Sequence, residues 1–171
     1  MIKFAIIAIL SGVALGLVFK GSFIHLLLSL AAMFLIVLPV ILFLSAWIIL
    51  SKMALEKVNK KLIITYSSTL ITLVAILASM GVGSFMHSLE IKEAREYVNV
   101  LIPELEKYKD LNGHYPSDLS IISALTPPEI LQKVNSYTSD DDSFCFLFKD
   151  TSTMMSGYRF DSSIGSWQYF D

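Results

Sequence analysis

The feature that most constrains this chain is a set of three long stretches without charged side chains in its first half. They cover about residues 4–19, 26–50 and 62–86, and each is rich in Leu, Ile, Val, Ala and Phe. A helix of about 20 apolar residues crosses the hydrocarbon core of a bilayer. Three transmembrane helices are therefore expected. The second should be kinked at Pro39, because proline removes a hydrogen-bond donor from a helix interior.

The charge of the chain changes sign at the end of the third stretch. Residues 1–86 carry six Lys and one Glu, a net charge of +5, whereas residues 87–171 carry seven Lys or Arg and fourteen Asp or Glu, a net charge of −7. We expect a transmembrane domain over residues 1–86 and a water-soluble, extracytoplasmic domain over residues 87–171. Nucleic acid is excluded as a partner, since phosphate binding needs clustered positive charge on the exposed domain.

The connections between the stretches predict their orientation. Residues 51–61 hold one acidic residue and four lysines, namely Glu56 and Lys52, Lys57, Lys60 and Lys61, whereas residues 20–25 hold one lysine. Lysine-rich loops stay on the cytoplasmic side. Three spans then place the N-terminus in the cytoplasm and residues 87–171 in the periplasm of a bacterial inner membrane. A cleaved signal peptide is the alternative for the first stretch, but its small residues lie inside the apolar run, which favours retention.

Small residues recur at helical spacing in two of the stretches. Gly12 and Gly16 form a GxxxG motif in the first, and the third carries a stripe of Ser68, Thr72, Ala75, Ser79 and Gly83. Small side chains let two helix backbones approach closely. The simplest interpretation is packing within the three-helix bundle. The alternative is an interface with a further copy of the chain or with another membrane protein.

The soluble part begins with an amphipathic pattern. Apolar residues at alternating steps of three and four run from Ile91 to Tyr108 and predict a helix, which Pro103 should kink or split. Three short aromatic runs follow and predict a three-stranded antiparallel sheet: Phe144–Phe148, Gly157–Phe160 and Trp167–Phe170. Because a small sheet needs a cover on one face, we expect the long helix to lie on it.

The segment after this helix carries a resemblance. The residues Asn112-Gly113-His114-Tyr115-Pro116, followed by Leu119, resemble the helix-end turn of type II secretion pseudopilins and type IV pilins. The resemblance covers about residues 62–171 and implies a pilin-like α+β domain whose structural turn is formed by Asn112, Gly113, Tyr115 and Pro116. A prepilin-peptidase site is missing, because residues 20–26, the nearest stretch, lack its Glu. We expect a pilin-like domain on a multi-span membrane anchor.

Two groups of residues are candidates for metal binding. Asp140, Asp141 and Asp142 are candidate calcium ligands, since calcium prefers carboxylate oxygens and major pseudopilins have an acidic loop near the sheet. The alternative is a solvated turn, because three consecutive side chains diverge. His87 and Glu90 lie one helical turn apart, but an HxxE pair without a second His is more typical of a histidine at the membrane interface than of a metal site.

The aromatic residues of the last strands leave two interpretations open. Tyr158, Trp167 and Tyr169 form either an exposed recognition patch or part of the core, and a domain short of aliphatic residues favours the core.

No group of residues predicts catalysis or a cofactor. We therefore expect a non-enzymatic inner-membrane protein whose periplasmic domain mediates protein–protein contacts, as an accessory of a secretion or envelope assembly. The expected partners are the lipid bilayer, a membrane or periplasmic protein, and a further copy of the chain. The alternative is a membrane-anchored immunity protein that captures a toxin in the periplasm, which an acidic exposed domain suits equally well.

Overall fold

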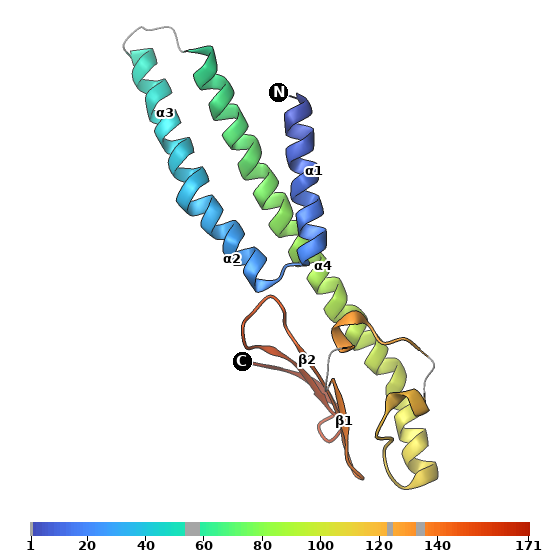
Figure 1. The fold of residues 1–171 in the computed structure, drawn as a ribbon. Helices are drawn as coiled ribbons and strands as arrows, with labels where there is room; N and C mark the ends of the chain where they lie inside the picture. The colour runs from blue at the N-terminus through green and yellow to red at the C-terminus, as the bar shows by residue number, and fades with distance from the viewer. Residues whose placement is uncertain (1, 54–58, 123–124, 133–135) are drawn as a thin grey trace. The chain divides into compact units, whose positions relative to one another are not determined.

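The computed structural model describes residues 2–53, 59–122, 125–132 and 136–171. The chain divides into two compact units, Met1–Met86 and His87–Asp171, which are described separately (Figure 1). Glu56 and Lys57, which entered the orientation argument, lie outside the described residues.

The first unit is helical. It holds α1 (Ile2–Phe19), the consecutive elements α2 (Phe23–Ala32), η1 (Met33–Val37) and α3 (Leu38–Met53), and the first part of α4 (Lys60–Asn112). Within the described residues, three helices are thus long and apolar enough to cross a membrane. Their outward side chains are apolar, with Leu35 76% exposed and Val18 73% exposed, as expected of a surface that meets lipid tails.

Pro39 is accommodated by a change of helix type rather than by a break. Proline has no backbone N–H, so the carbonyl of Leu35, four residues earlier, loses its usual partner. Leu35 lies in the π-helical turn η1, where the N–H of Leu38 bonds to the carbonyl of Met33 instead. The wider turn lets α2 continue into α3.

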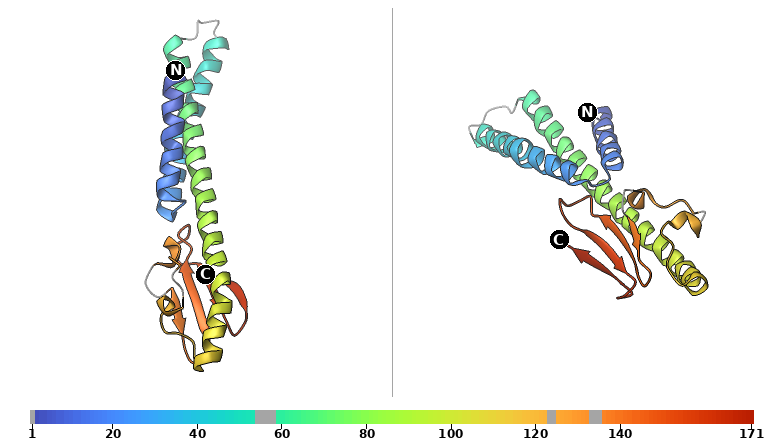
Figure 2. Two further views of the ribbon diagram at one scale, coloured as in Figure 1. Left: turned by 90° about the vertical axis from the view of Figure 1, so that its right-hand side faces the viewer. Right: turned by 60° about the horizontal axis from the view of Figure 1, so that its bottom comes forward.

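The second unit combines the last part of α4 with an antiparallel sheet. Two short 3-10 turns, η2 (Leu119–Ile121) and η3 (Glu129–Leu131), lie between helix and sheet in the chain. The strands follow in the order β1 (Tyr137–Ser139), β2 (Phe144–Lys149), β3 (Gly157–Asp161) and β4 (Ser166–Phe170), which is also their order in the sheet. Figure 2 shows from two further directions that α4 lies along one face of this sheet.

Two expectations about the second unit are wrong. The sheet has four strands rather than three, because Tyr137–Ser139 pairs with β2, with Tyr137 opposite Phe146. Three residues are too few for an alternating pattern to be visible in a sequence. Pro103 does not split α4, which continues to Asn112. Both Pro103 and Asn99, whose carbonyl loses its bond, lie on the exposed side of the helix.

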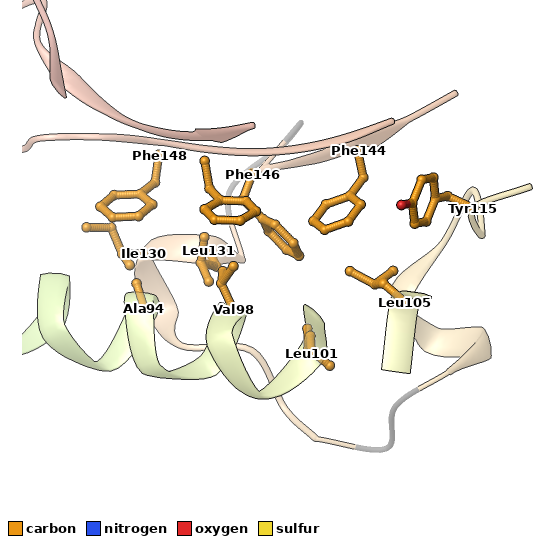
Figure 3. Packing of buried hydrophobic residues seen from close by; sticks show 11 residues of the cluster. Ala94, Val98, Leu101, Leu105, Tyr115, Ile130, Leu131, Phe144, Phe146 and Phe148 are labelled. Atoms are coloured by element: carbon orange, nitrogen blue, oxygen red, sulfur yellow. The ribbon is translucent and has the colours of Figure 1, made fainter. Parts of the chain in front are cut away.

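The core of the second unit lies between α4 and the sheet (Figure 3). The helix contributes a stripe of fully buried residues spaced by three or four: Ala94, Val98, Leu101 and Leu105. Alternate residues of β2 face them, namely Phe144, Phe146 and Phe148. Each such ring contributes roughly 2 kcal/mol through burial. Ala94 lies beside Phe148 and Leu105 beside Phe144, so β2 runs antiparallel to α4.

Candidate functional site

The glycines of α1 lie directly against α4. A Cβ atom on Gly16 would lie 2.5 Å from the carbonyl oxygen of Ser79, and one on Gly12 would collide with the carbonyl oxygen of Ala75. Gly12 and Gly16 are four residues apart on α1, and Ala75 and Ser79 are four residues apart on α4. The GxxxG motif and the stripe of α4 therefore meet in register. The structure thus brings these two predicted groups together within one chain, as close backbone packing requires.

The remaining members of the stripe have different surroundings. Gly83 faces Gly21, with 2.8 Å between its Cβ position and the backbone nitrogen of Gly21. Ser68 and Thr72 donate their hydroxyls to carbonyls of their own helix, those of Thr65 and Ser68. The close contact with α1 and the following turn therefore involves the part of the stripe from Ala75 to Gly83.

A buried histidine in the first unit was missed in the sequence, where it was assigned to a loop. His25 is 8% exposed, and its Nε2 atom lies 2.8 Å from the hydroxyl oxygen of Ser79. Its ring stacks on Phe19, and among the described residues its Nδ1 atom has no hydrogen-bond partner. His25 also lines a cavity of about 420 Å³. The histidine connects α2 with α4 by a polar contact inside an apolar bundle.

The segment that resembles a pilin turn begins at the end of α4. Asn112 is the last helical residue and donates from Nδ2 to the carbonyl of Tyr108 at 2.9 Å. Gly113 has a φ of +80° and donates its N–H to the carbonyl of Lys109 at 2.7 Å. This left-handed residue with its 5→1 hydrogen bond is a helix C-cap that favours glycine.

Tyr115 and Pro116 join this turn to the sheet. Tyr115 is 6% exposed and packs edge-on against Phe144, while its hydroxyl donates to both carboxylate oxygens of Glu106, at 2.9 and 3.0 Å. Burial, together with Glu106, raises the pKa of Tyr115 to about 12. The carbonyl of Pro116 accepts hydrogen bonds from the hydroxyls of Tyr137 and Ser139. The turn is therefore tied to both α4 and β1.

The three aspartates lie in the turn between β1 and β2. The Asp140 carboxylate accepts hydrogen bonds from the N–H groups of Asp142 and Ser143, at 3.0 and 2.5 Å. The Ser143 bond and then the Asp142 bond lower the pKa of the Asp140 carboxyl. Because this carboxylate already accepts hydrogen bonds from N–H groups of its own turn, Asp140 stabilises the turn. Among the described residues, no group of three or more His, Cys, Asp or Glu could hold a metal ion.

A buried polar pair in the second unit joins His87, which the sequence placed beside Glu90, to an aspartate that no sequence pattern indicated. His87, on α4, and Asp150, directly after β2, are 6% and 7% exposed, and 2.7 Å separates Nε2 from Oδ1. Since a carboxylate only accepts, the imidazole donates. Burial raises the pKa of Asp150, but hydrogen bonds from Ser152 and His87 outweigh this effect and keep it below the ordinary value.

The surroundings of this pair favour a structural role. The Thr151 hydroxyl lies 3.3 Å from Nδ1 of His87, which gives the order hydroxyl, imidazole, carboxylate known from hydrolases. The imidazole and the carboxylate are nevertheless buried, with side chains 7% and 8% exposed, and they join two secondary-structure elements. The pair fastens the end of β2 to α4.

The three aromatic residues of β3 and β4 divide between core and surface. Tyr158 and Trp167 pack against the core, and the guanidinium of Arg95 lies 4.6 Å from the ring centre of Tyr158 and 5.6 Å from that of Trp167. Tyr169 is 49% exposed, and its hydroxyl lies 3.5 Å from the Asp150 carboxylate. Most of this group therefore serves packing, and Tyr169 alone extends to the surface.

A cavity of about 470 Å³ opens on the second unit between α4, η2, η3, β1 and β2. Two tyrosines, Tyr97 and Tyr137, line it together with the aliphatic residues Leu119, Leu125 and Leu131. Among its described lining residues Asp118 is the one charged group. Its volume and its mixture of apolar walls with a few polar groups are those of a binding pocket. No sequence motif indicated it, because its walls come from several elements that are separate in the chain.

No family model, no curated protein and no solved structure matches this chain.

Proposed function

We infer that this chain is a non-enzymatic membrane protein whose second unit binds another protein. The observation that carries this proposal is the cavity beside Tyr97 and Tyr137 on the second unit. Binding energy at protein interfaces concentrates in a few side chains, often aromatic, that enter well-packed pockets on the partner. The cavity would receive such a side chain from the partner.

Charge suggests the character of the partner. Residues 87–171 carry a net charge of −7, from seven Lys or Arg and fourteen Asp or Glu, and the charged lining residue of the cavity is Asp118. An acidic surface attracts a basic partner and raises the rate of encounter. The partner is therefore a protein with an apolar anchor residue in a basic surface.

The proposed location is a bacterial inner membrane, with the N-terminus in the cytoplasm and the second unit in the periplasm. Lys52, Lys60 and Lys61 at the described edges of the α3–α4 connection support this orientation. A long helix on an antiparallel sheet and the capped turn at Gly113 support a pilin-like character of the second unit. Such a unit on several membrane helices fits an accessory of a secretion or envelope assembly.

An immunity protein is the second candidate function. The net charge of −7 on residues 87–171 favours it, since a basic toxin arriving in the periplasm would be captured by an acidic domain. The two candidates share the cavity and differ in the identity of the bound protein.

Photo-crosslinking in living cells tests the proposal. A benzophenone amino acid replaces Leu125, which lines the cavity and is 54% exposed, or Leu111, which is 76% exposed and lies away from it. We expect a discrete crosslinked protein from position 125 and none from position 111. Ser117→Trp, which adds a large ring at an exposed lining position of the cavity, should abolish the product, whereas Leu111→Trp should not.

The identity of the crosslinked protein separates the two candidates. A component of an envelope assembly supports the accessory role, and a toxin whose lethality the chain suppresses supports the immunity role. Equal crosslinking from both positions, or a product that Ser117→Trp leaves unchanged, would contradict the cavity as the binding site.

A further inference from the structure

The loop between β2 and β3 carries two exposed methionines. Met154 is 76% exposed and Met155 is 82% exposed, the largest value for a large apolar side chain among the described residues. Neighbouring apolar side chains at such exposure are unfavourable in water, and contiguous exposed apolar surface often marks an interaction site.

The same loop turns its polar groups inward. Ser152 donates its N–H and its hydroxyl to the Asp150 carboxylate, at 2.9 and 2.5 Å. The Thr153 hydroxyl donates to the carbonyl of Asp150 at 3.1 Å and accepts from the N–H of Ser156 at 3.2 Å. Residues 151–158 include no charged side chain. The tip therefore combines apolar side chains with paired polar groups, which lowers the cost of leaving water.

The course of β2 places the loop along α4. Near the start of β2, Nζ of Lys109 donates to the carbonyl of Asp142 at 3.0 Å, and at its end His87 bonds to Asp150 at 2.7 Å. The strand thus runs from the last turn of α4 toward the position of His87. His87 directly follows the apolar run 62–86 of the same continuous helix.

The length of that run locates His87 in a bilayer. As a helix, residues 62–86 extend about 37 Å, more than the hydrocarbon core of about 30 Å. When Lys60 and Lys61 lie at one surface, the other end of the run reaches the opposite headgroup layer. The hydrogen bond from His87 holds Asp150, and with it the start of the loop, close to this layer.

We propose that Met154 and Met155 rest in the headgroup layer of the bilayer that α4 crosses. They give the second unit its own contact with lipid. Methionine is flexible and apolar, and it adapts to an irregular surface. Lipid is favoured over a protein as the occupant because the loop starts beside the residue that follows the span. The inference requires that α4 spans the membrane, but not that the second unit binds a protein.

Fluorescence quenching in vesicles tests this contact. In the full chain with Cys145→Ser, a single cysteine at Met155, Leu111 or Leu77 carries an environment-sensitive label. Leu111 matches Met155 in exposure and lies at the far end of α4, and Leu77, 50% exposed, lies within the run 62–86. The vesicles are of phosphatidylcholine with a nitroxide either on the headgroup or on the acyl chain.

We expect the label at position 155 to be blue-shifted relative to position 111 and quenched by the headgroup nitroxide, and the label at position 77 to be quenched by the acyl nitroxide. Quenching at 77 with a water-like signal at 155 overturns the inference alone. Absence of quenching at 77 overturns it together with the membrane placement of α4. A signal at 155 that changes only when a protein extract is added overturns it in favour of a protein occupant.

Discussion

The imidazole of His87 donates a 2.7 Å hydrogen bond to the carboxylate of Asp150, although the two residues are 63 positions apart in the chain. The bond joins α4 to the end of β2 at a buried position. Removing His87 takes one hydrogen bond from the buried carboxylate, which keeps those from Ser152, and removing Asp150 takes one from the buried imidazole. Such a loss at a buried position costs about 1–3 kcal/mol. For a unit of this size, such a loss is a large part of the total stability.

The first prediction concerns acid stability and Asp150. Because the pKa of Asp150 lies below its ordinary value of 3.8 in the folded state, the carboxylate stabilises the fold above that pH and loses its effect as the pH falls through the folded pKa. Asp150→Asn should lower the melting temperature by several degrees near neutral pH, and the difference from the parent should shrink below about pH 4. Near-ultraviolet circular dichroism of the full chain in detergent measures both.

Other carboxyls, such as the exposed Asp140, also have a lowered pKa and serve as the control for this prediction. Their acid response is common to the parent and Asp150→Asn and cancels in the comparison. A difference between the two proteins that is constant from about pH 6 to about pH 3 would contradict the role assigned to Asp150.

The second prediction concerns the turn after α4. Gly113→Val places a Cβ in a left-handed conformation and should cost roughly 1 kcal/mol or more. Tyr115→Ala removes a ring packed on Phe144 and should cost about 3 kcal/mol. Tyr115→Phe keeps the ring and loses only the bond to Glu106, so it should cost about 1 kcal/mol. Thermal unfolding that ranks Tyr115→Phe level with Tyr115→Ala would show that the ring contributes little.

The features that could be predicted from the sequence have local signals. The length of the apolar stretches predicts three helices. The alternation of Phe144, Phe146 and Phe148 with other residues predicts β2. Strand β1 could not be predicted, because Tyr137–Ser139 is short and is placed by the hydrogen bonds of the Asp140 turn. Continuity of α4 through Pro103 depends on core contacts on both sides, which override the local preference of proline.

The polar contacts could not be predicted for a different reason. His87 and Asp150 meet because β2 packs antiparallel to α4, and no spacing in the sequence records this. His25 was interpreted as a loop residue because the second apolar stretch was counted from Leu26, but α2 already begins at Phe23. The cavity beside Tyr97 depends on segments that meet only in the folded unit.

The third prediction separates the aspartates of the β1–β2 turn. Asp140→Asn replaces a carboxylate that accepts two backbone N–H bonds by a neutral amide. The hydrogen bonds should weaken and the melting temperature should fall. Asp141→Asn should change it little. If the turn carries no calcium, millimolar calcium should leave the melting temperature of the parent unchanged. A rise with calcium that Asp141→Asn abolishes would establish a calcium site there.

The fourth prediction concerns topology. The lysines beside the α3–α4 connection should stay in the cytoplasm, so that the end of α4 and the residues after it are exported. Alkaline phosphatase fused after Asp171 should be active, and green fluorescent protein at the same position should be dark. The reverse pair of signals would contradict the orientation. A second fusion within residues 20–22, between α1 and α2, would then test the number of spans.

The fifth prediction concerns the contact of α1 with α4. Gly12→Leu or Gly16→Leu forces a side chain into the carbonyl of Ala75 or Ser79 and should separate the two helices. Gly81→Leu is the matched control, since a Cβ at Gly81 meets nothing within 4 Å. The first two variants should lose thermal stability and homogeneity in detergent, and the third should behave like the parent. Equal behaviour of all three would place the α1–α4 contact elsewhere.

The glycines of α1 also bear on what can be exchanged in this protein. A simple tether would tolerate any apolar helix of the right length in place of α1. Here the facing carbonyls of Ala75 and Ser79 leave no room for a side chain at two positions one turn apart. A different apolar helix joined to residues 20–171 should still insert into a bilayer, but it should not pack closely against α4 at Ala75 and Ser79. The first helix is therefore specific to this protein, because Gly12 and Gly16 have no Cβ where any other residue would carry one.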